Sequence, residues 1–352
     1  MNSIYVNLAA EIHISVKKKI INFLDSNNPS NLTLKQLQEF IECEIKDQVN
    51  NLYKTNDTLF GKTPYNFGLA FPIGLSLDNV VAHYTPVSLP QSILENIPAI
   101  FNEQSKLNNF SVIKIDYGII IEGNIIDSAF TINLNNSELS TILIDSSREI
   151  TKNICNSIGA DQRLNDLADI ANEIIDSYEN PITNIPLKLV ENVYSHNILP
   201  SQIHGGKFIR PDYKKYSDDW KVKAGELYAI EFYPTSGSGL AMLTPYTQVY
   251  SHYKLRDTCK KIPIFDTQST NKIVTIINNN LNKVPFCPNF IDLHVKSIKH
   301  HKTIKTLQQL YSLNYLDSYP PIVESDPKGI VSQTEATVEI KDNETVNVVC
   351  GL

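Results

Sequence analysis

Apolar residues recur at helical spacing near the start of the chain. Ile12, Val16 and Ile20 follow one another every four residues, which places them on one face of a helix. The pattern resumes after a turn at 27–29, so the segment 7–50 is predicted to be helical.

Later segments alternate between the periods of strand and helix. The segments predicted to form strands are 67–83, 110–134, 187–242 and 329–349, and further helix is predicted over 137–178 and 265–316. Strands and helices are therefore mixed along the chain, and one helical block comes late. This order favours a single α+β domain that carries an insertion.

Two aspartates lie in an apolar segment that has the pattern of a hairpin. Two β-rich runs flank Glu122-Gly123-Asn124, with Asp116 in the first run and Asp127 in the second. Whether the loop is Glu122-Gly123 or Gly123-Asn124, side-chain alternation puts both carboxylates on the same face. With the first loop they are diagonal neighbours, roughly 7–8 Å apart. Strands disfavour Asp, and close carboxylates repel unless a cation lies between them, so the pattern indicates a cation site rather than two surface aspartates.

Other residues of metal-binding type lie in or beside predicted strands. They are His83, His196, His204, Glu231 and Glu335. Each alone is compatible with an ordinary polar position, whereas together with the two aspartates they would form a carboxylate-rich two-metal site. A ligand set that mixes carboxylate with imidazole suits transition metals. Four other histidines, His13, His294, His300 and His301, are expected on helix surfaces.

Composition narrows the class of protein. The 352 residues are 42% hydrophobic with a formal net charge of −7, which excludes disorder as the main state and disfavours a nucleic-acid binder. No apolar run reaches the ~18 residues of a membrane span. The first ten residues lack the pattern of a secretory signal. Five scattered cysteines form no CxxC pair, which indicates a reducing compartment, and we expect the cytoplasm.

The order and context of these residues resemble the type 2 methionine aminopeptidases. The matching segments are AAEIH at 9–13, LAFPIGLSLDNVVAHYTP at 69–86, KIDYG and IIDSAF within 114–130, SHNI and IHGGK within 195–207, GELYAIEFYPTSGSG at 225–239, YSHY at 250–253 and YPPI at 319–322. The resemblance implies the pita-bread (creatinase/aminopeptidase) fold, a mixed β-sheet flanked by helices. It implies a catalytic domain of residues 1–242 plus 319–352 and a helical insertion of type 2 kind at 243–318.

The resemblance also implies roles for individual residues. Asp116 would bind one divalent metal, Asp127 and Glu335 would bridge two, and His196 and Glu231 would bind the other. His83 would contact the peptide, His204 would assist the scissile carbonyl, and Glu231 would act as general acid and base for a metal-activated water. The residues expected to line the methionine pocket are Phe71, Ile203, His252, Tyr319 and Ile322. The two metals are expected to be Mn, Co, Zn or Fe, and the substrate the N-terminal methionine of nascent polypeptides.

The sequence departs from the family pattern at several positions. Ser195 stands where a glycine usually precedes the metal-binding histidine, and Ala336 stands where a histidine usually follows the last glutamate. We expect these changes to affect turnover and pocket shape more than metal binding. Two alternatives stay open: a non-catalytic relative that binds ribosomes or other proteins, and a prolidase-like dipeptidase. A monomer is expected.

Overall fold

The computed structural model describes nearly the whole chain. The described residues are 3–27, 31–56, 68–89, 95, 97–244, 250–281, 284–295, 297–341 and 345–352. Residues 28 and 29 of the predicted turn and residue 67 of the first predicted β segment lie outside them.

Seven described α-helices have the following bounds. They are α1 (Ser3–Ser26), α2 (Leu34–Thr55), α4 (Glu138–Ser157), α5 (Leu164–Ile175), α7 (Gln268–Asn280), α8 (Pro288–His294) and α9 (His300–Ser312). The helices predicted over 7–50, 137–178 and 265–316 are confirmed, each divided into two or three pieces by a short break. None of the described helices is long and apolar enough to cross a membrane.

The strands form two larger sheets, packed side by side as two halves of one central β layer, together with three smaller ladders. Their bounds are β1 (Gly74–Leu77), β2 (Val80–Ala82), β3 (Val112–Ile121), β4 (Asn124–Asn133), β5 (Lys188–Leu189), β6 (Ser195–Ile198), β7 (Phe208–Ile209), β8 (Leu227–Phe232), β9 (Pro234–Thr235), β10 (Ala241–Leu243), β11 (His252–Leu255), β12 (Leu316–Tyr319), β13 (Ile322–Glu324), β14 (Thr334–Ile340) and β15 (Val346–Cys350). One half has the order β1-β3-β4 and the other β15-β14-β8-β6-β7. The smaller ladders are β10-β13-β2, β11-β12 and β5-β9.

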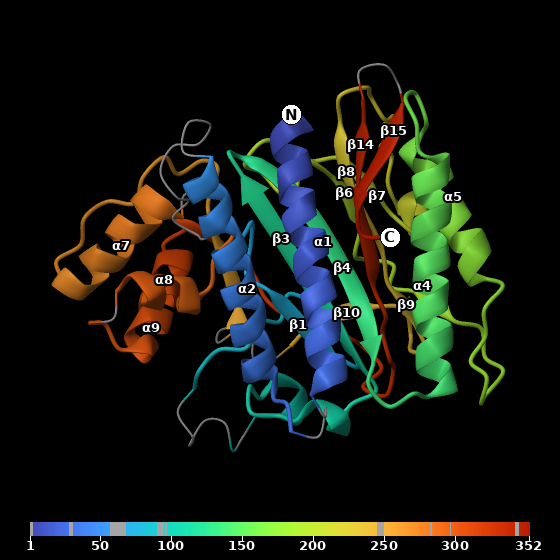
Figure 1. Ribbon diagram of the computed structural model, residues 1–352, viewed down its shortest axis with the longest axis horizontal. Helices are drawn as coiled ribbons and strands as arrows, with labels where there is room; N and C mark the ends of the chain where they lie inside the picture. The colour runs from blue at the N-terminus through green and yellow to red at the C-terminus, as the bar shows by residue number, and fades with distance from the viewer. Residues whose placement is uncertain are drawn as a thin grey trace.

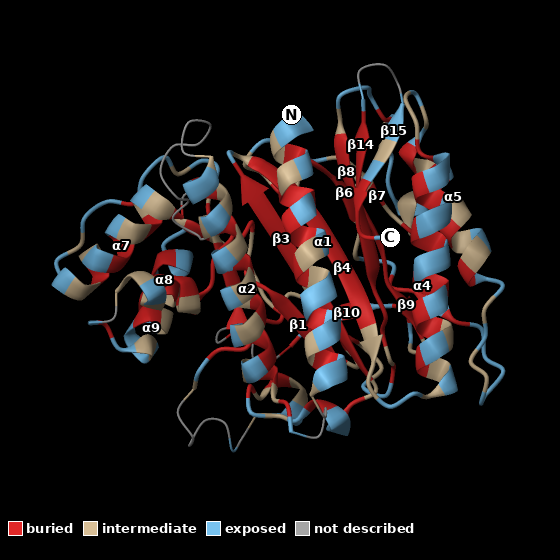
Figure 2. Ribbon diagram, in the orientation of Figure 1, coloured by how far each residue is buried: buried red, intermediate tan, exposed pale blue. Residues whose placement is uncertain are grey.

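Helices cover the two halves separately (Figure 1). α1 packs on β3 and β4, and α4 packs on β14 and β8. α7, α8 and α9 form a group at one end of the molecule, next to α2 (Figure 1). Figure 2 shows that the central strands are largely buried and that the exposed residues lie on the outward faces of the helices, in loops and on part of β15. This is the arrangement expected when amphipathic helices cover an apolar sheet.

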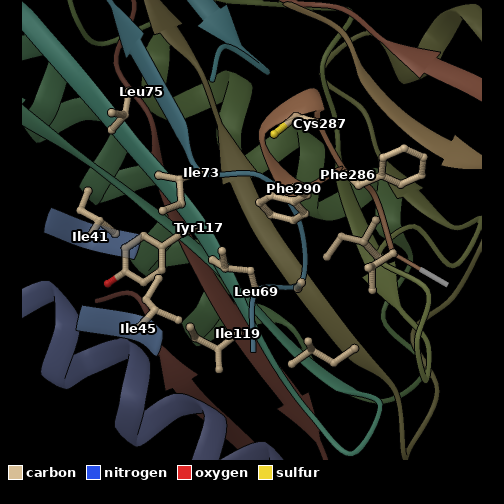
Figure 3. Packing of buried hydrophobic residues seen from close by; sticks show 14 of the residues in the cluster. Ile41, Ile45, Leu69, Ile73, Leu75, Tyr117, Ile119, Phe286, Cys287 and Phe290 are labelled. Atoms are coloured by element: carbon tan, nitrogen blue, oxygen red, sulfur yellow. The ribbon is translucent and has the colours of Figure 1, made fainter. Parts of the chain in front are cut away.

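The main hydrophobic core connects the N-terminal helices to the late helical block. It contains Ile41 and Ile45 of α2, Tyr117 of β3, and Phe286 and Phe290 beside or within α8 (Figure 3). The late helices therefore pack against the sheet through a shared hydrophobic core. The block 243–318 also contains strands β11 and β12, which the helical pattern did not predict.

His13 is buried, so the prediction that it lies on a helix surface is wrong. Its ring is fully enclosed, stacks on Tyr117 at 4.1 Å, and its Nε2 lies 3.1 Å from the Tyr117 carbonyl and 3.3 Å from the Ser128 carbonyl. Burial lowers the pKa of His13 to about 3, so the ring is neutral. The sequence contained a signal for this, because position 13 lies on the same helical stripe as Ala9 and Val16.

Side-chain hydroxyls join β4 to β14 at the seam between the two halves of the sheet. The Thr337 hydroxyl donates to the Asp127 carbonyl and accepts from the Asp127 N–H at 2.9 Å. The Ser128 hydroxyl donates to the Glu335 carbonyl at 2.8 Å. These bonds satisfy buried backbone groups of the two strands where they lie side by side. They also fix the backbone of two predicted metal ligands, Asp127 and Glu335.

Replacing Thr337 by Val is expected to destabilise the fold. The substitution keeps the shape but leaves the buried N–H and carbonyl of Asp127 without a partner, at a cost of about 2–3 kcal/mol. Urea unfolding measures the difference. Thr275→Val is the matched control, because Thr275 is exposed on α7 and should change stability by less than about 0.5 kcal/mol. Equal effects of the two substitutions would contradict a structural role for the seam.

Candidate metal centre

The hairpin of β3 and β4 has the loop that places its two aspartates diagonally. Ile121 pairs with Asn124, so the loop is Glu122-Gly123, and both loop residues have positive φ, +47° and +79°. Such φ values belong to a type I′ turn, which fits the twist of a two-residue hairpin. Asp116 pairs with Ala129 and Asp127 with Gly118, so the two carboxylates share one face as predicted.

Ligand-type side chains from four strands meet beside this hairpin. Ligand atoms of Asp127, His196 and Glu335 all lie within 4.8 Å of one another. The Nε2 of His196 lies 3.7 Å from Asp127 Oδ2 and 3.9 Å from Glu231 Oε1. Glu231 on β8 is the direct cross-strand partner of Glu335 on β14. Like charges directly opposite one another are destabilising, so this pairing calls for a cation between them.

The carboxylates retain oxygen atoms that nothing in the described protein satisfies. Asp116 Oδ1, Asp127 Oδ1 and Glu335 Oε2 are buried and have no hydrogen-bond partner among the described residues. Buried polar atoms are rarely left unpaired in folded proteins, and a group of them indicates a missing ligand. Hard oxygen donors from several carboxylates together with one imidazole are the donor set of a divalent transition-metal site. The residues therefore fit the metals that the sequence analysis expected.

Burial and mutual repulsion perturb the pKa values of the carboxylates. Burial raises the pKa of Asp116 to about 7 and that of Glu231 to about 8, and the charge of Asp116 adds to the effect on Glu231. The pKa values of Asp127 and Glu335 lie well above the ordinary range, first through burial and then through repulsion from neighbouring carboxylates. Without a cation, the cluster therefore holds protons at neutral pH.

Glu231 is held by three neighbouring side chains. The Tyr233 hydroxyl and the Gln333 amide both donate to its Oε2, the latter at 3.1 Å. The Ser195 hydroxyl bonds the Glu231 backbone, donating to its carbonyl at 2.6 Å and accepting from its N–H at 2.9 Å. The serine that replaces the family's glycine thus contributes two hydrogen bonds to the backbone of a candidate ligand. Ala336, the other departure, is buried in the apolar core under α4 and α5.

Three histidines near the cluster are held neutral by burial. Burial lowers the pKa of His196 to about 4 and the pKa of His204 well below the usual range, and it also lowers the pKa of His83. The rings of His196 and His204 meet edge to face at 4.4 Å. A neutral imidazole has one acceptor and one donor nitrogen, so each ring offers a lone pair for a metal or an N–H for a substrate oxygen.

All of the predicted site residues line one cavity of about 240 Å³. They are Asp116, Asp127, His196, Glu231, Glu335, His83, His204, Phe71, Ile203, His252, Tyr319 and Ile322. The carboxylates and His196 come from the centre of the sheet, and the apolar and aromatic residues come from the loops and ladders beside it.

The β11-β12 ladder brings two of these residues together from distant parts of the chain. His252 and Tyr319 are direct cross-strand partners. The His252 ring nitrogen Nε2 lies 2.7 Å from the Thr85 hydroxyl, which fixes the ring. The His83 ring lies 6.3 Å from His252 and 6.4 Å from Tyr319. These contacts build one aromatic wall of the cavity.

Backbone features make room for two residues of this wall. His83 has φ +65°, an unusual value for a non-glycine residue that costs about 1–3 kcal/mol and persists where the surroundings impose it. Gly118 lies against Phe71, because a Cβ at position 118 would come within 2.4 Å of the Phe71 ring. A side chain at position 118 would therefore displace Phe71 from the cavity wall.

The cavity also contains residues that sequence reasoning missed. They are Asn192, Val193, Tyr194, Phe208, Tyr233 and Pro285. Tyr233 could have been found, since it shares a strand face with Glu231. Asn192, Val193 and Tyr194 directly precede the SHNI segment, which was a weaker signal. For Pro285 the sequence offered none, because its position depends on how the late helices pack.

Comparison with solved structures identifies the fold as the pita-bread fold. The chain is similar to a thermophilic Arx1, with a TM-score of 0.73 at 12% identity over 99% of this chain and 90% of that one. It is also similar to the methionine aminopeptidase of Thermotoga maritima, with a TM-score of 0.57 at 11% identity over 100% of this chain and 98% of that one. The predicted fold class is therefore confirmed.

Comparison with curated sequences identifies the family. The chain is 31% identical over 277 residues to methionine aminopeptidase 2-2 of Chaetomium globosum, covering 78% of this chain and 57% of that protein. It is 30% identical over 332 residues to methionine aminopeptidase 2 of Debaryomyces hansenii, covering 94% of this chain and 70% of that protein. No family model matches the chain. The chain belongs to the methionine aminopeptidase 2 family.

Divalent metal is expected to stabilise the protein through this cluster. Mn²⁺ at about 100 times its dissociation constant should add about 2.7 kcal/mol to the free energy of unfolding. Thermal unfolding with and without metal measures the gain. Asp127→Asn should abolish it, whereas Asp145→Asn should not, because Asp145 is 58% exposed on α4. Stabilisation that survives Asp127→Asn would place the metal elsewhere.

Metal affinity is expected to rise with pH. The pKa values of Asp116 and Glu231 are about 7 and about 8 in the metal-free protein, so metal must displace protons below those values. The dissociation constant for Mn²⁺ should fall by at least about tenfold per pH unit from pH ~6 to ~7 and level off above pH ~8. Calorimetry in two buffers with different ionisation enthalpies counts the protons released. A pH-independent affinity over this range would show that the cluster is already deprotonated.

Proposed function

We propose that this protein removes the N-terminal methionine from peptides and nascent proteins in a metal-dependent reaction. The observation that carries the proposal is the buried group of Asp127, His196 and Glu335, whose unsatisfied oxygens open onto the same cavity as the predicted substrate residues. Membership of the methionine aminopeptidase 2 family supports this reaction over others. The proposed ligands are Asp116, Asp127, His196, Glu231 and Glu335, for two ions of Mn, Co, Zn or Fe.

The side chains around the carboxylate cluster are suited to the separate steps of peptide hydrolysis. A bound divalent cation would polarise the scissile carbonyl and lower the pKa of a bound water. Glu231 Oε2 is occupied by Tyr233 and Gln333, so Oε1, which faces His196, is the oxygen that would take a proton from water and return it to the leaving amine. His204, kept neutral by burial, would donate its N–H to the oxyanion that forms at the scissile carbonyl.

The wall of aromatic and aliphatic residues supports methionine as the bound side chain. Phe71, Ile203 and Ile322 supply apolar surface, and His252 and Tyr319 supply ring edges and faces. A flexible, polarisable thioether packs well against such a surface. His83, whose ring lies 6.3 Å from His252 and 6.4 Å from Tyr319 in this wall, would contact the peptide backbone.

One test distinguishes the proposed function from two others: a non-catalytic protein that binds ribosomes or other proteins, and a prolidase-like dipeptidase. Bound metal is measured together with methionine release from Met-Ala-Ser and cleavage of an Xaa-Pro dipeptide. Metal binding with methionine release supports the proposal. A protein that stays metal-free and inactive after addition of Mn or Co supports the binding protein. Preferential cleavage of the Xaa-Pro dipeptide supports the dipeptidase.

Glu231→Gln is expected to abolish most of the activity. The amide cannot accept the water proton, so turnover of Met-Ala-Ser should fall by about 10²–10⁴-fold. Steady-state kinetics at saturating metal measures the loss. Glu191→Gln makes the same chemical change at a position 51% exposed on the surface and should leave turnover unchanged. Near-normal turnover by Glu231→Gln would contradict its acid–base role.

A further inference from the structure

A second group of aromatic side chains packs around a single arginine beside the cavity. The guanidinium carbon of Arg210 lies 4.2 Å from the centroid of Tyr216, 5.0 Å from Phe208 and from Trp220, and 5.2 Å from Tyr194. The hydroxyls of Tyr194 and Tyr216 are hydrogen-bonded at 2.8 Å. We call these five residues the Arg210 cluster.

Two members of the Arg210 cluster form part of the cavity wall. Tyr194 and Phe208 both line it. Phe208 on β7 is the direct cross-strand partner of His196 on β6. Cross-strand partners project from the same face about 4.5–5.5 Å apart, so the Phe208 ring lies next to a proposed metal ligand.

This wall is separate from the one proposed to bind methionine. The rings of His83, His252 and Tyr319 contact one another and His204. The rings of Tyr194 and Phe208 instead contact each other, Tyr216 and Trp220. Among the described residues no ring contact joins these two groups, so the cavity that holds His196 and the carboxylates has two separate aromatic surfaces.

The Arg210 cluster offers ring surface rather than charge. The Arg210 side chain is only 13% exposed and is paired with Asp218, which neutralises it. Its remaining contacts are the faces of the four rings, a cation–π arrangement that fixes their orientation. Fixed rings bind apolar side chains at little entropic cost. Because the charge of Arg210 is already paired with Asp218, a charged side chain on a ligand would gain little from it.

We propose that Tyr194 and Phe208 form a subsite for an apolar side chain in the part of the peptide that follows the scissile bond, with Arg210 as the positioning residue that fixes the two rings. The inference rests on the proposed function, which puts the scissile carbonyl at the carboxylates. A peptide advances at most about 3.3–3.6 Å per residue, so the third substrate residue can reach the position on β7 that pairs with His196.

The test compares Met-Ala-Xaa peptides with Xaa as Ser, Leu, Phe or Asp. The wall contacts the ground state and the transition state alike, so KM should be about tenfold lower for Leu and Phe than for Ser and Asp, with kcat unchanged. Phe208→Ala should remove this preference while Met-Ala-Ser is still cleaved. Tyr178→Ala is the matched aromatic control, because Tyr178 does not line the cavity and its hydroxyl donates to Glu149.

Arg210 is tested by substitutions that change its charge or only its shape. Arg210→Gln should raise KM for the Phe peptide without lowering kcat, and Arg210→Lys, which keeps a cation over the rings, should restore part of the affinity. Equal KM values for the four peptides in the unaltered protein would overturn the proposal. So would a preference that survives Phe208→Ala.

Failure of the proposed function would be recognised separately. If no peptide releases methionine, the same four peptides are titrated against the metal-loaded protein, with Trp220 as the reporter. Trp220 is the only tryptophan in the chain and its ring lies 6.0 Å from Phe208. Dissociation constants about tenfold lower for Leu and Phe than for Ser and Asp would support the subsite without catalysis, and equal constants would overturn it.

Discussion

Four carboxylates, three of them buried and that of Asp116 partly buried, converge at the centre of this fold, and no lysine or arginine among the described residues forms an ion pair with any of them. Desolvating one carboxylate is costly, and bringing four together adds repulsion to that cost. The chain must therefore hold the ligands in place by forces other than their own attraction. Where metal is absent, the raised pKa values of Asp116 and Glu231 show that protons take over part of the neutralisation.

The ligands are held in place by the seam between the two halves of the sheet. Asp127 and Glu335 come from strands that are more than 200 residues apart in the chain, and hydroxyls of Ser128 and Thr337 tie those strands together. A buried lysine adds to the seam. Lys114 is fully enclosed and donates to the carbonyls of Asp78 and Val331 at 3.0 and 2.9 Å, and burial lowers its pKa to about 7. The geometry of the centre thus depends on polar bonds of neighbouring residues as much as on the ligands.

The sequence correctly predicted the features of the fold that depend on local periodicity. The sequence placed Asp116 and Asp127 on one face of the hairpin for either of the two candidate loops, and the structure selects Glu122-Gly123, which fixes the register. The contacts of the His13 ring with backbone carbonyls of β3 and β4 were missed, because helical periodicity does not show which strands a helix will cover. The pairing of His252 with Tyr319 was missed as well, because it joins segments separated by three helices. Family resemblance, not periodicity, brought those two residues into the predicted pocket.

The departures from the family pattern show how the same centre tolerates a changed sequence. A glycine before His196 would leave the Glu231 backbone N–H and carbonyl to find other partners, whereas Ser195 satisfies both with one hydroxyl. Ser195 therefore adds rigidity to the strand that carries Glu231, although its side chain occupies space that a glycine would leave free. Next to it, Tyr194 extends the aromatic surface towards Arg210.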